Sequence, residues 1–196
     1  YFSGGLIPTY LLIRDLKLQG AAIDTWGVGT KLITSEDCPS LGGVYKLSAT
    51  RAPGQAEWVD RLKISESAAK LTVPGVLDVR RYYNEDGTIA GDMVFDVNSG
   101  VDEGQVIVDP LDSMRRKKLA GKRFSTMLEP LARNGQVVLD ANGRSAMEAQ
   151  QRCREGLACL DESQKRMLNP HTYPVGLEYG LCERRRALVG KLRGIA

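Results

Sequence analysis

The residues best suited to chemistry lie near the start of the chain, in the sequence Gly27-Val28-Gly29-Thr30. The two glycines allow positive φ angles, so that successive backbone N–H groups can converge on one point. The hydroxyl of Thr30 and the ammonium of Lys31 stand next to these glycines. Such a concave group of donors suits a phosphate ester. The same residues also fit an ordinary tight turn, because short glycine pairs are common in turns.

A helix and a short strand are predicted just before this bend, and they would fix its position in the fold. Residues 11–19 predict a helix, with Leu12 and Leu16 on one face and Gly20 in position to end it. Residues 21–26 predict a short buried strand that runs into the glycines. This order of elements is typical of a late unit of a β/α barrel, where phosphate sites favour the loops after the last strands.

The middle of the chain, from residue 44 to about residue 108, is expected to be β-rich. Short strands are predicted over residues 44–49, 59–64 and 71–73. The clearest hairpin pairs residues 76–83 with 88–97 across a turn that ends in Asp86-Gly87, a pair that tolerates left-handed backbone angles. Apolar residues alternate with small and acidic ones on the second strand, so one face is expected to be mostly apolar.

The last part of the chain predicts mainly helix. A strand over residues 137–139 follows the turn signal Asn134-Gly135, and Ser145 with Glu148 forms a capping box that opens a helix. This helix is expected to end at Asn169-Pro170. Its expected buried stripe comprises Met147, Ala149, Cys153, Leu157 and Leu160, with Leu168 further on.

Composition excludes several classes of protein. With 196 residues, of which 42% are hydrophobic and 26% charged, the chain fits an ordinary globular protein. The net charge of +3 is too small to indicate a nucleic-acid partner, and the basic runs at residues 115–123 and 184–193 are expected to be solvated faces. The longest nearly apolar run, residues 6–13, is too short to cross a bilayer and lacks the flanks of a secretory leader. Neither nucleic acid nor a membrane is expected as a partner.

The cysteines, at positions 38, 153, 159 and 182, form no C-x-x-C pair, and the single histidine is not spaced with them as a metal ligand would be. A zinc site is therefore not expected. Reduced thiols in a cytoplasmic protein are the simplest account.

A series of segments, in one order along most of the chain, resembles the C-terminal part of nicotinate phosphoribosyltransferase. The segments are WGVGTKLIT, PSLGGVYKL, WVDRLKISES, KLTVPG and NPHTYPV, and they cover roughly residues 11–180. The ordered set is specific although no single segment is decisive. Members of that family are longer than this chain, which begins with Tyr1 rather than Met. The resemblance therefore implies the last portion of a larger enzyme.

The resemblance implies an α/β fold: the C-terminal part of a type II phosphoribosyltransferase-like β/α barrel, followed by a β-rich module and a helical tail. On this basis the last barrel units, with the phosphate-binding bend, are expected in residues 1–43. The β-rich module is expected in residues 44–140 and the helical tail in residues 141–196.

The implied reaction joins nicotinate to 5-phosphoribosyl 1-diphosphate in NAD biosynthesis, with ATP and Mg²⁺ as implied cofactors. The ligands of these cofactors are not identifiable in this chain. The phosphorylated histidine and the nicotinate contacts are expected outside it, so the fragment alone is expected to be inactive. A homodimer is one assembly that the resemblance allows. The alternative is a non-catalytic fragment that binds a phosphate ligand or has a structural role.

The resemblance places the bend at the phosphate end of the phosphoribosyl pocket. The implied substrate-binding residues there are Gly27, Val28, Gly29 and Thr30, with the amides of Gly29 and Thr30 and the Thr30 hydroxyl as donors. Ser3-Gly4-Gly5-Leu6 resembles the family's serine–glycine–aspartate–leucine turn, whose acid contacts ribose hydroxyls. A glycine takes the place of that acid here, which leaves Ser3 and Gly4 as phosphate candidates only through their amides.

Gly42-Gly43, Lys46 and His171 are further candidates. Gly42-Gly43 either lets the backbone approach a ligand or forms a bend between domains, and Lys46 either faces phosphate or ATP or lies at the surface. His171 lies in a proline-bracketed segment and is expected to help dock the tail rather than to act in catalysis. Neither a catalytic residue nor a metal ligand is assigned in this chain.

Overall fold

The computed structural model describes residues 9–35, 39–40, 43–67, 70–138 and 145–195. The chain divides into two units, residues 1–45 and 46–196. Helices and strands are both present, which confirms the expected α/β class in its general form.

The described part of the first unit holds α1 (Thr9–Leu18) and α2 (Thr30–Thr34). α1 confirms the helix predicted over residues 11–19, and Gly20 follows it with a φ of +80°. The strand predicted over residues 21–26 is wrong, because residues 21–29 are irregular. The described residues of this unit contain no strand with which residues 21–26 could pair. A strand there would therefore leave its backbone N–H and C=O groups without partners.

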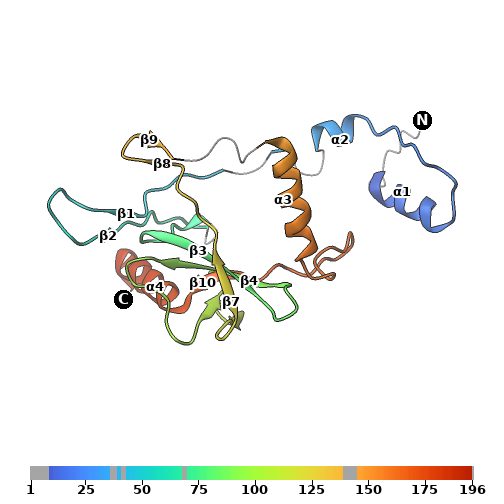
Figure 1. Ribbon diagram of the computed structural model, residues 1–196. Coiled ribbons are helices and arrows are strands. Elements are labelled where there is room, and N and C mark those ends of the chain that lie inside the picture. The colour runs from blue at the N-terminus through green and yellow to red at the C-terminus, as the bar shows by residue number, and fades with distance from the viewer. Residues whose placement is uncertain (1–8, 36–38, 41–42, 68–69, 139–144, 196) are drawn as a thin grey trace. The chain divides into compact units, whose positions relative to one another are not determined.

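The second unit is built on a six-stranded sheet in the order β6-β5-β10-β4-β3-β7 (Figure 1). Its strands are β3 (Leu77–Tyr83), β4 (Ile89–Asp96), β5 (Val106–Val108), β6 (Arg116–Lys118), β7 (Arg123–Thr126) and β10 (Val175–Glu178). Neighbouring strands run antiparallel except β10 and β4, which run parallel. A parallel pair needs a long crossover connection, and here most of the second half of the chain lies between the two strands.

The predicted hairpin is confirmed as β3 and β4. The turn closes with the Asn84 amide donating to the Thr88 carbonyl at 2.8 Å, and Gly87 has the left-handed φ of +86° that the turn requires. A β-bulge between Tyr82 and Tyr83 shifts the register near this turn. The hairpin therefore forms where the sequence predicts, with one irregularity that the alternation does not show.

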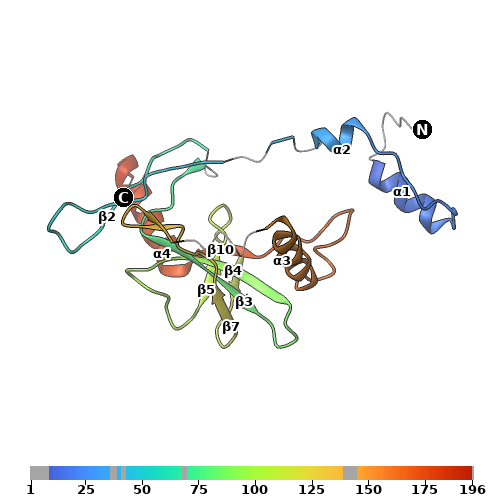
Figure 2. The ribbon, with the colours of Figure 1, turned by 45° about the horizontal axis from the view of Figure 1, so that its top comes forward.

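The core lies on both faces of the sheet, whereas the sequence predicts one apolar face for the second strand of the hairpin. One cluster comprises Tyr82, Ala90, Met93, Phe95, Ile107 and Leu119, and the other comprises Val108, Leu177, Leu181 and Cys182. Val94 packs against the second cluster, so β4 contributes to both. β4 is covered in this way because it is central in the sheet and α4 (Tyr179–Arg193) packs on β10, the neighbour of β4, and on β5 (Figure 2).

β10 is a strand that the sequence analysis does not predict. Leu177 pairs with Val94 of β4 on one side and with Val108 of β5 on the other. Glu178 then ends the strand and caps α4, its carboxylate accepting from the amides of Gly180 and Leu181 at 2.9 and 2.7 Å. Residues 141–196 thus contribute a strand to the sheet as well as helices, and the predicted domain boundaries stay predictions.

Two short hairpins lie outside this sheet: β1 (Ala49–Thr50) with β2 (Val59–Asp60), and β8 (Ala132–Arg133) with β9 (Gln136–Val137). β1 and β2 are shorter than the strands predicted over residues 44–49 and 59–64. β8 and β9 turn at Asn134-Gly135, both with positive φ, as the turn signal predicts.

α3 (Ala146–Ala158) begins with the predicted capping box, in which the Ser145 amide donates to Glu148 Oε2 at 2.8 Å. The prediction of a buried stripe is wrong, because no described residue of α3 is buried and Met147 is 81% exposed. The helix also ends well before residues 169–170. Asp161 Oδ1 accepts from the Ser163 amide at 2.8 Å, and such a local turn competes with helix.

Candidate functional site

The bend predicted to bind phosphate leads into α2 rather than out of a strand. The carbonyl of Gly29 accepts from the amides of Leu32 and Ile33 at 3.0 and 3.3 Å, so Gly29 stands just before the helix. Thr30 is exposed, and its carbonyl accepts from Thr34 Oγ1 at 2.8 Å. Within the described residues, the amides of Gly29 and Thr30 have no backbone acceptor, as is usual at a helix start. The expected donors are therefore adjacent and open to solvent.

The glycines of this bend do not have the left-handed angles that the sequence analysis expects. Neither Gly27 nor Gly29 has a φ between +20° and +160°, and a Cβ added at either would meet nothing within 4 Å. In this conformation other residues would fit at positions 27 and 29 equally well. The prediction that these glycines are needed for positive φ angles is therefore wrong. The phosphate-binding role of Gly27, Val28, Gly29 and Thr30 stays a prediction. Ser3 and Gly4 lie outside the described residues.

Lys46 and His171, the weaker candidates, both have local roles. The half-buried Lys46 ammonium donates to the carbonyl of Lys70, which favours the structural interpretation over ligand binding. The His171 amide donates to the Ser163 carbonyl at 3.0 Å, and the residue itself is exposed. The segment that follows His171 leads directly into β10. Gly43 is exposed, and Gly42 lies outside the described residues.

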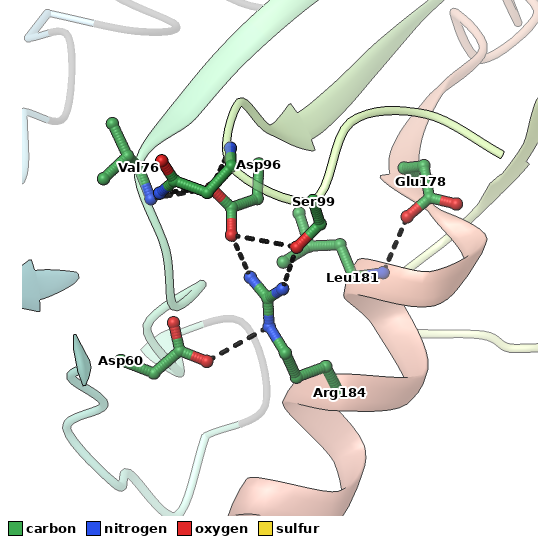
Figure 3. A network of polar contacts seen from close by, with 8 residues as sticks. Asp60, Val76, Asp96, Ser99, Glu178, Leu181 and Arg184 are labelled. Atoms are coloured by element: carbon green, nitrogen blue, oxygen red, sulfur yellow. Dashed lines mark hydrogen bonds and ion pairs between the residues drawn. The ribbon is translucent and has the colours of Figure 1, made fainter. Parts of the chain in front are cut away.

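A polar network surrounds Arg184 of α4 (Figure 3). Its Nη2 lies 2.5 Å from Asp96 Oδ2 and its Nη1 donates to Ser99 Oγ at 2.6 Å, while its Nε lies 3.1 Å from Asp60 Oδ2. One side chain thus joins α4 to the end of β4 and to β2. Nη1 and Nη2 donate hydrogen bonds, whereas Nε forms an ion pair with Asp60 without a hydrogen bond, so this arginine fits a structural clamp better than a site for an anionic ligand.

Asp96, the buried member of this network, is 4% exposed. Its Oδ1 accepts from the amides of Val76 and Asn98 at 3.2 and 3.1 Å. Burial raises the pKa of Asp96, but the hydrogen bonds from the Asn98 amide and from Arg184 lower it more, so that the pKa lies below its ordinary value. Asp96 therefore stays ionised in the folded protein at neutral pH.

A cleft of about 530 Å³ adjoins the Arg184 network. One side is formed by the residues around β2, including Trp58, and the other by Asp96, Asn98, Ser99 and Arg184. Trp58 is 41% exposed, and the guanidinium of Arg51 lies 4.9 Å from its ring centroid. The cleft combines an aromatic wall with polar groups that are already paired.

A second polar group joins Arg81 of β3, Asp92 of β4 and Tyr173. Arg81 donates to both carboxylate oxygens of Asp92, at 2.9 and 2.8 Å. This pair raises the pKa of Arg81, and burial together with Asp92 raises the pKa of Tyr173. Both side chains therefore keep their protons at neutral pH, and neither is suited to act as a base. Tyr173 also lines a cleft of about 570 Å³.

The basic cluster at residues 184–186 is only partly the solvated face that the sequence predicts, because Arg186 is exposed whereas Arg184 is half-buried and Arg185 is buried. Arg185 is only 7% exposed and donates to the carbonyls of Thr72 and Leu71 at 3.2 and 3.3 Å. These bonds take backbone acceptors in the segment 71–73, which is irregular, so the strand predicted there is wrong. The run at 115–123 is largely exposed, as expected, although Lys117 donates to the Ala90 carbonyl at 2.6 Å.

A signal for the missed networks is present in the sequence. Asp92 and Asp96 stand in a strand that is otherwise apolar or small, and buried acids need a basic or hydrogen-bonding partner. That signal predicts that the acids are paired, but it does not say with which of the many arginines.

The described residues contain neither a candidate metal cluster nor a candidate membrane span. No group of three or more His, Cys, Asp or Glu residues there could hold a metal ion. None of the described helices is both long and apolar enough to cross a membrane. Cys153, Cys159 and Cys182 are free thiols, and Cys38 lies outside the described part of the chain.

Residues 78–185 match the protein family described as nicotinate phosphoribosyltransferase C-terminal domain, and this match spans more than half of the chain. The chain belongs to the nicotinate phosphoribosyltransferase family. The family match includes most of the six-stranded sheet and the networks around Arg81 and Arg184. The resemblance seen in the sequence is therefore confirmed.

Known relatives are similar to this chain over most of its length. Nicotinate phosphoribosyltransferase of Bacillus subtilis (strain 168) is 35% identical over 168 residues, which cover 84% of this chain and 34% of the relative. The enzyme of that name from Homo sapiens is 30% identical over 182 residues, covering 92% of this chain and 32% of the relative. A crystal structure of human nicotinic acid phosphoribosyltransferase shares 24% identity, with a TM-score of 0.49 over 62% of this chain and 23% of that chain. The chain spans about a third of the length of the curated relatives.

Proposed function

We propose that this protein is a nicotinate phosphoribosyltransferase. In the proposed reaction, the nitrogen of nicotinate attacks C1 of 5-phosphoribosyl 1-diphosphate, which releases diphosphate and forms nicotinate mononucleotide. Hydrolysis of ATP to ADP and phosphate drives the reaction forward. The proposed setting is NAD biosynthesis in the cytoplasm, and a homodimer is the proposed assembly.

The observation that carries this proposal is family membership. The matched family covers residues 78–185, and named relatives are similar over 84% and 92% of the chain. Because the chain spans about a third of those relatives, the proposed activity requires residues beyond these 196.

The proposed contribution of this chain is an anchor for the 5-phosphate. The amides of Gly29 and Thr30 would donate to the phosphate, with the Thr30 hydroxyl beside them and Gly27 and Val28 shaping the bend. A fixed phosphate sets the position of C1 relative to the attacking nitrogen. Such positioning is worth up to about 7–11 kcal/mol in the best intramolecular reactions. The support for this role is that these donors are adjacent and exposed at the start of α2.

We also propose that residues 1–43 complete a β/α barrel, that residues 44–140 form a β-rich module and that residues 141–196 form the tail. The order of the shared sequence segments supports this division. The described residues do not fit a magnesium site, since they bring together no group of three suitable side chains.

The test is a turnover assay on the longest protein that the gene encodes, beside the 196-residue chain. The long form is expected to produce nicotinate mononucleotide, and the short chain is expected not to. A long form that binds 5-phosphoribosyl 1-diphosphate without turnover would instead support a non-catalytic phosphate-ligand module. His171→Ala serves as a control in the long form and is expected to retain activity, because His171 is exposed in the connection to β10.

A further inference from the structure

Arg80 of β3 is held between two aromatic rings. Its Cζ lies 4.6 Å from the ring centroid of Phe95 on β4 and 4.4 Å from that of Phe124 on β7. Both distances are within the range of about 6 Å in which a ring attracts a cation. Rings contributed by both neighbouring strands therefore fix the guanidinium on one face of the sheet.

No hydrogen bond or ion pair to the side chain of Arg80 is found among the described residues. Its Nε is buried without a hydrogen-bond partner, and in the part of the chain that the structure describes Arg80 has no side-chain hydrogen bond or ion pair. The adjacent Arg81, by contrast, makes a bidentate pair with Asp92. A guanidinium carries five donors, and a buried donor without an acceptor is costly.

The surroundings of Arg80 provide a second donor and leave the site accessible. Thr126 of β7 pairs directly with Arg80, so its hydroxyl lies on the same face of the sheet. Asp78 also lies on this face, two residues before Arg80, but its Oδ1 accepts from the Val79 amide at 2.6 Å. Phe124 is 47% exposed and Arg80 is half-buried, so the stack borders on solvent although Nε itself is buried.

We propose that Arg80 is an oxyanion-binding residue whose ligand is the phosphate or carboxylate group of a small molecule. The planar fork of a guanidinium matches such groups with two parallel hydrogen bonds. Stacking between Phe95 and Phe124 holds that fork in place before the ligand arrives, so little side-chain freedom is lost on binding. The Thr126 hydroxyl completes the donor set. This site is built from residues of the six-stranded sheet alone, and the inference does not rest on the function proposed above.

The test is an NMR titration of the full chain with inorganic phosphate and, separately, with acetate, at constant ionic strength. The Arg80 Nε–H signal is expected to shift and to saturate, and the Thr126 amide signal should follow it. Saturation by phosphate alone identifies a phosphate site, and saturation by acetate as well extends the ligand class to carboxylates. Either result supports the proposal.

The anion affinities of three variants distinguish specific binding at Arg80 from nonspecific attraction of anions to the basic surface. Arg80→Lys is expected to weaken binding roughly tenfold or more, because the bidentate contact is lost. Phe124→Leu keeps the arginine, removes one ring and is expected to weaken binding about threefold, which preserves the test should Arg80→Lys fail to fold. Arg123→Lys is the matched control with no expected effect, since Arg123 stacks on the single ring of Tyr83, 4.5 Å away.

The proposal is overturned if neither anion saturates the Arg80 signal. It is also overturned if all exposed arginines shift in parallel, which would indicate an adventitious ion only. Equal affinities in the original chain and in Phe124→Leu would show that the two-ring stack does not shape a site.

Discussion

Arg184 Nη2 lies 2.5 Å from Asp96 Oδ2, although the two residues are 88 positions apart in the chain. The pair joins the last helix to the end of a central strand, and Asp96 is almost completely buried. Removing the buried carboxylate takes a charged acceptor from Arg184 and from the Val76 and Asn98 amides together, which is far more costly than losing a surface pair.

Asp96→Asn is therefore expected to lower the free energy of unfolding by about 3 kcal/mol, measured by chemical denaturation. The control is Glu162→Gln, which breaks an ion pair with Lys165 in which the glutamate side chain is 88% exposed. The control should lose less than about 1 kcal/mol. Similar losses in both variants would show that the Asp96 network does not stabilise the fold.

The same carboxylate predicts a dependence of stability on pH. Although burial raises the pKa of Asp96, hydrogen bonds from the Asn98 amide and Arg184 bring it below its ordinary value of about 3.9. A lowered pKa in the folded state stabilises the protein above the ordinary value, and this stabilisation is lost as the pH falls through the folded pKa. Below about pH 4, stability should fall more steeply in the original chain than in Asp96→Asn. Parallel curves would contradict this assignment.

Thr30→Ala tests the proposed phosphate anchor in the longest form of the protein. Loss of a hydrogen bond to a charged group is expected to raise the KM for 5-phosphoribosyl 1-diphosphate roughly tenfold, with a smaller change in kcat. Thr34→Ala is the control, because Thr34 lies in the same short helix and its hydroxyl bonds only to the Thr30 carbonyl among described residues. Unchanged kinetics of Thr30→Ala at subsaturating substrate would remove Thr30 from the site.

Gly176→Ala and Gly156→Ala are matched substitutions that are expected to have opposite effects on stability. A Cβ at Gly176 would lie 2.7 Å from the Val108 carbonyl oxygen, in the backbone of the neighbouring strand. Gly176→Ala is therefore expected to destabilise the protein by about 1–3 kcal/mol. A Cβ at Gly156, within α3, would meet nothing within 4 Å, so Gly156→Ala should stabilise by up to about 1 kcal/mol. Thermal melting distinguishes the two, and a stable Gly176→Ala would contradict the tight pairing of β10 with β5.

Local signals predict the parts of the fold that depend on local chemistry. The Asp86-Gly87 turn, the Asn134-Gly135 turn and the capping box at Ser145 are all found, because each satisfies backbone groups within a few residues. β10 is not predictable in this way, since four residues show no clear period and its partners lie far away in the sequence.

The candidate sites differ in the same way, because one is formed by neighbours in the sequence and the others by residues that are far apart. The donors of the bend at residues 27–30 are neighbours in sequence, so their adjacency is predictable, but the strand expected before them has no partner among the described residues of its unit. The Arg80 stack and the Arg184 network are assembled from β3, β4, β7 and α4, and only the sheet order brings their members together. Sequence spacing carries no trace of such an arrangement.

The place of β10 between β4 and β5 bears on how the protein is made. While a ribosome has released only the residues before Val175, the strands β7, β3 and β4 can form one ladder and β5 with β6 another. Side-chain contacts such as that of Lys117 with the Ala90 carbonyl link the two ladders, but the strand that pairs with both is missing. Each ladder then has an open edge on which foreign chains can pair. A nascent chain that is cut or stalled before Val175 therefore exposes two strand edges to aggregation, and β10 closes both edges when it pairs with β4 and β5.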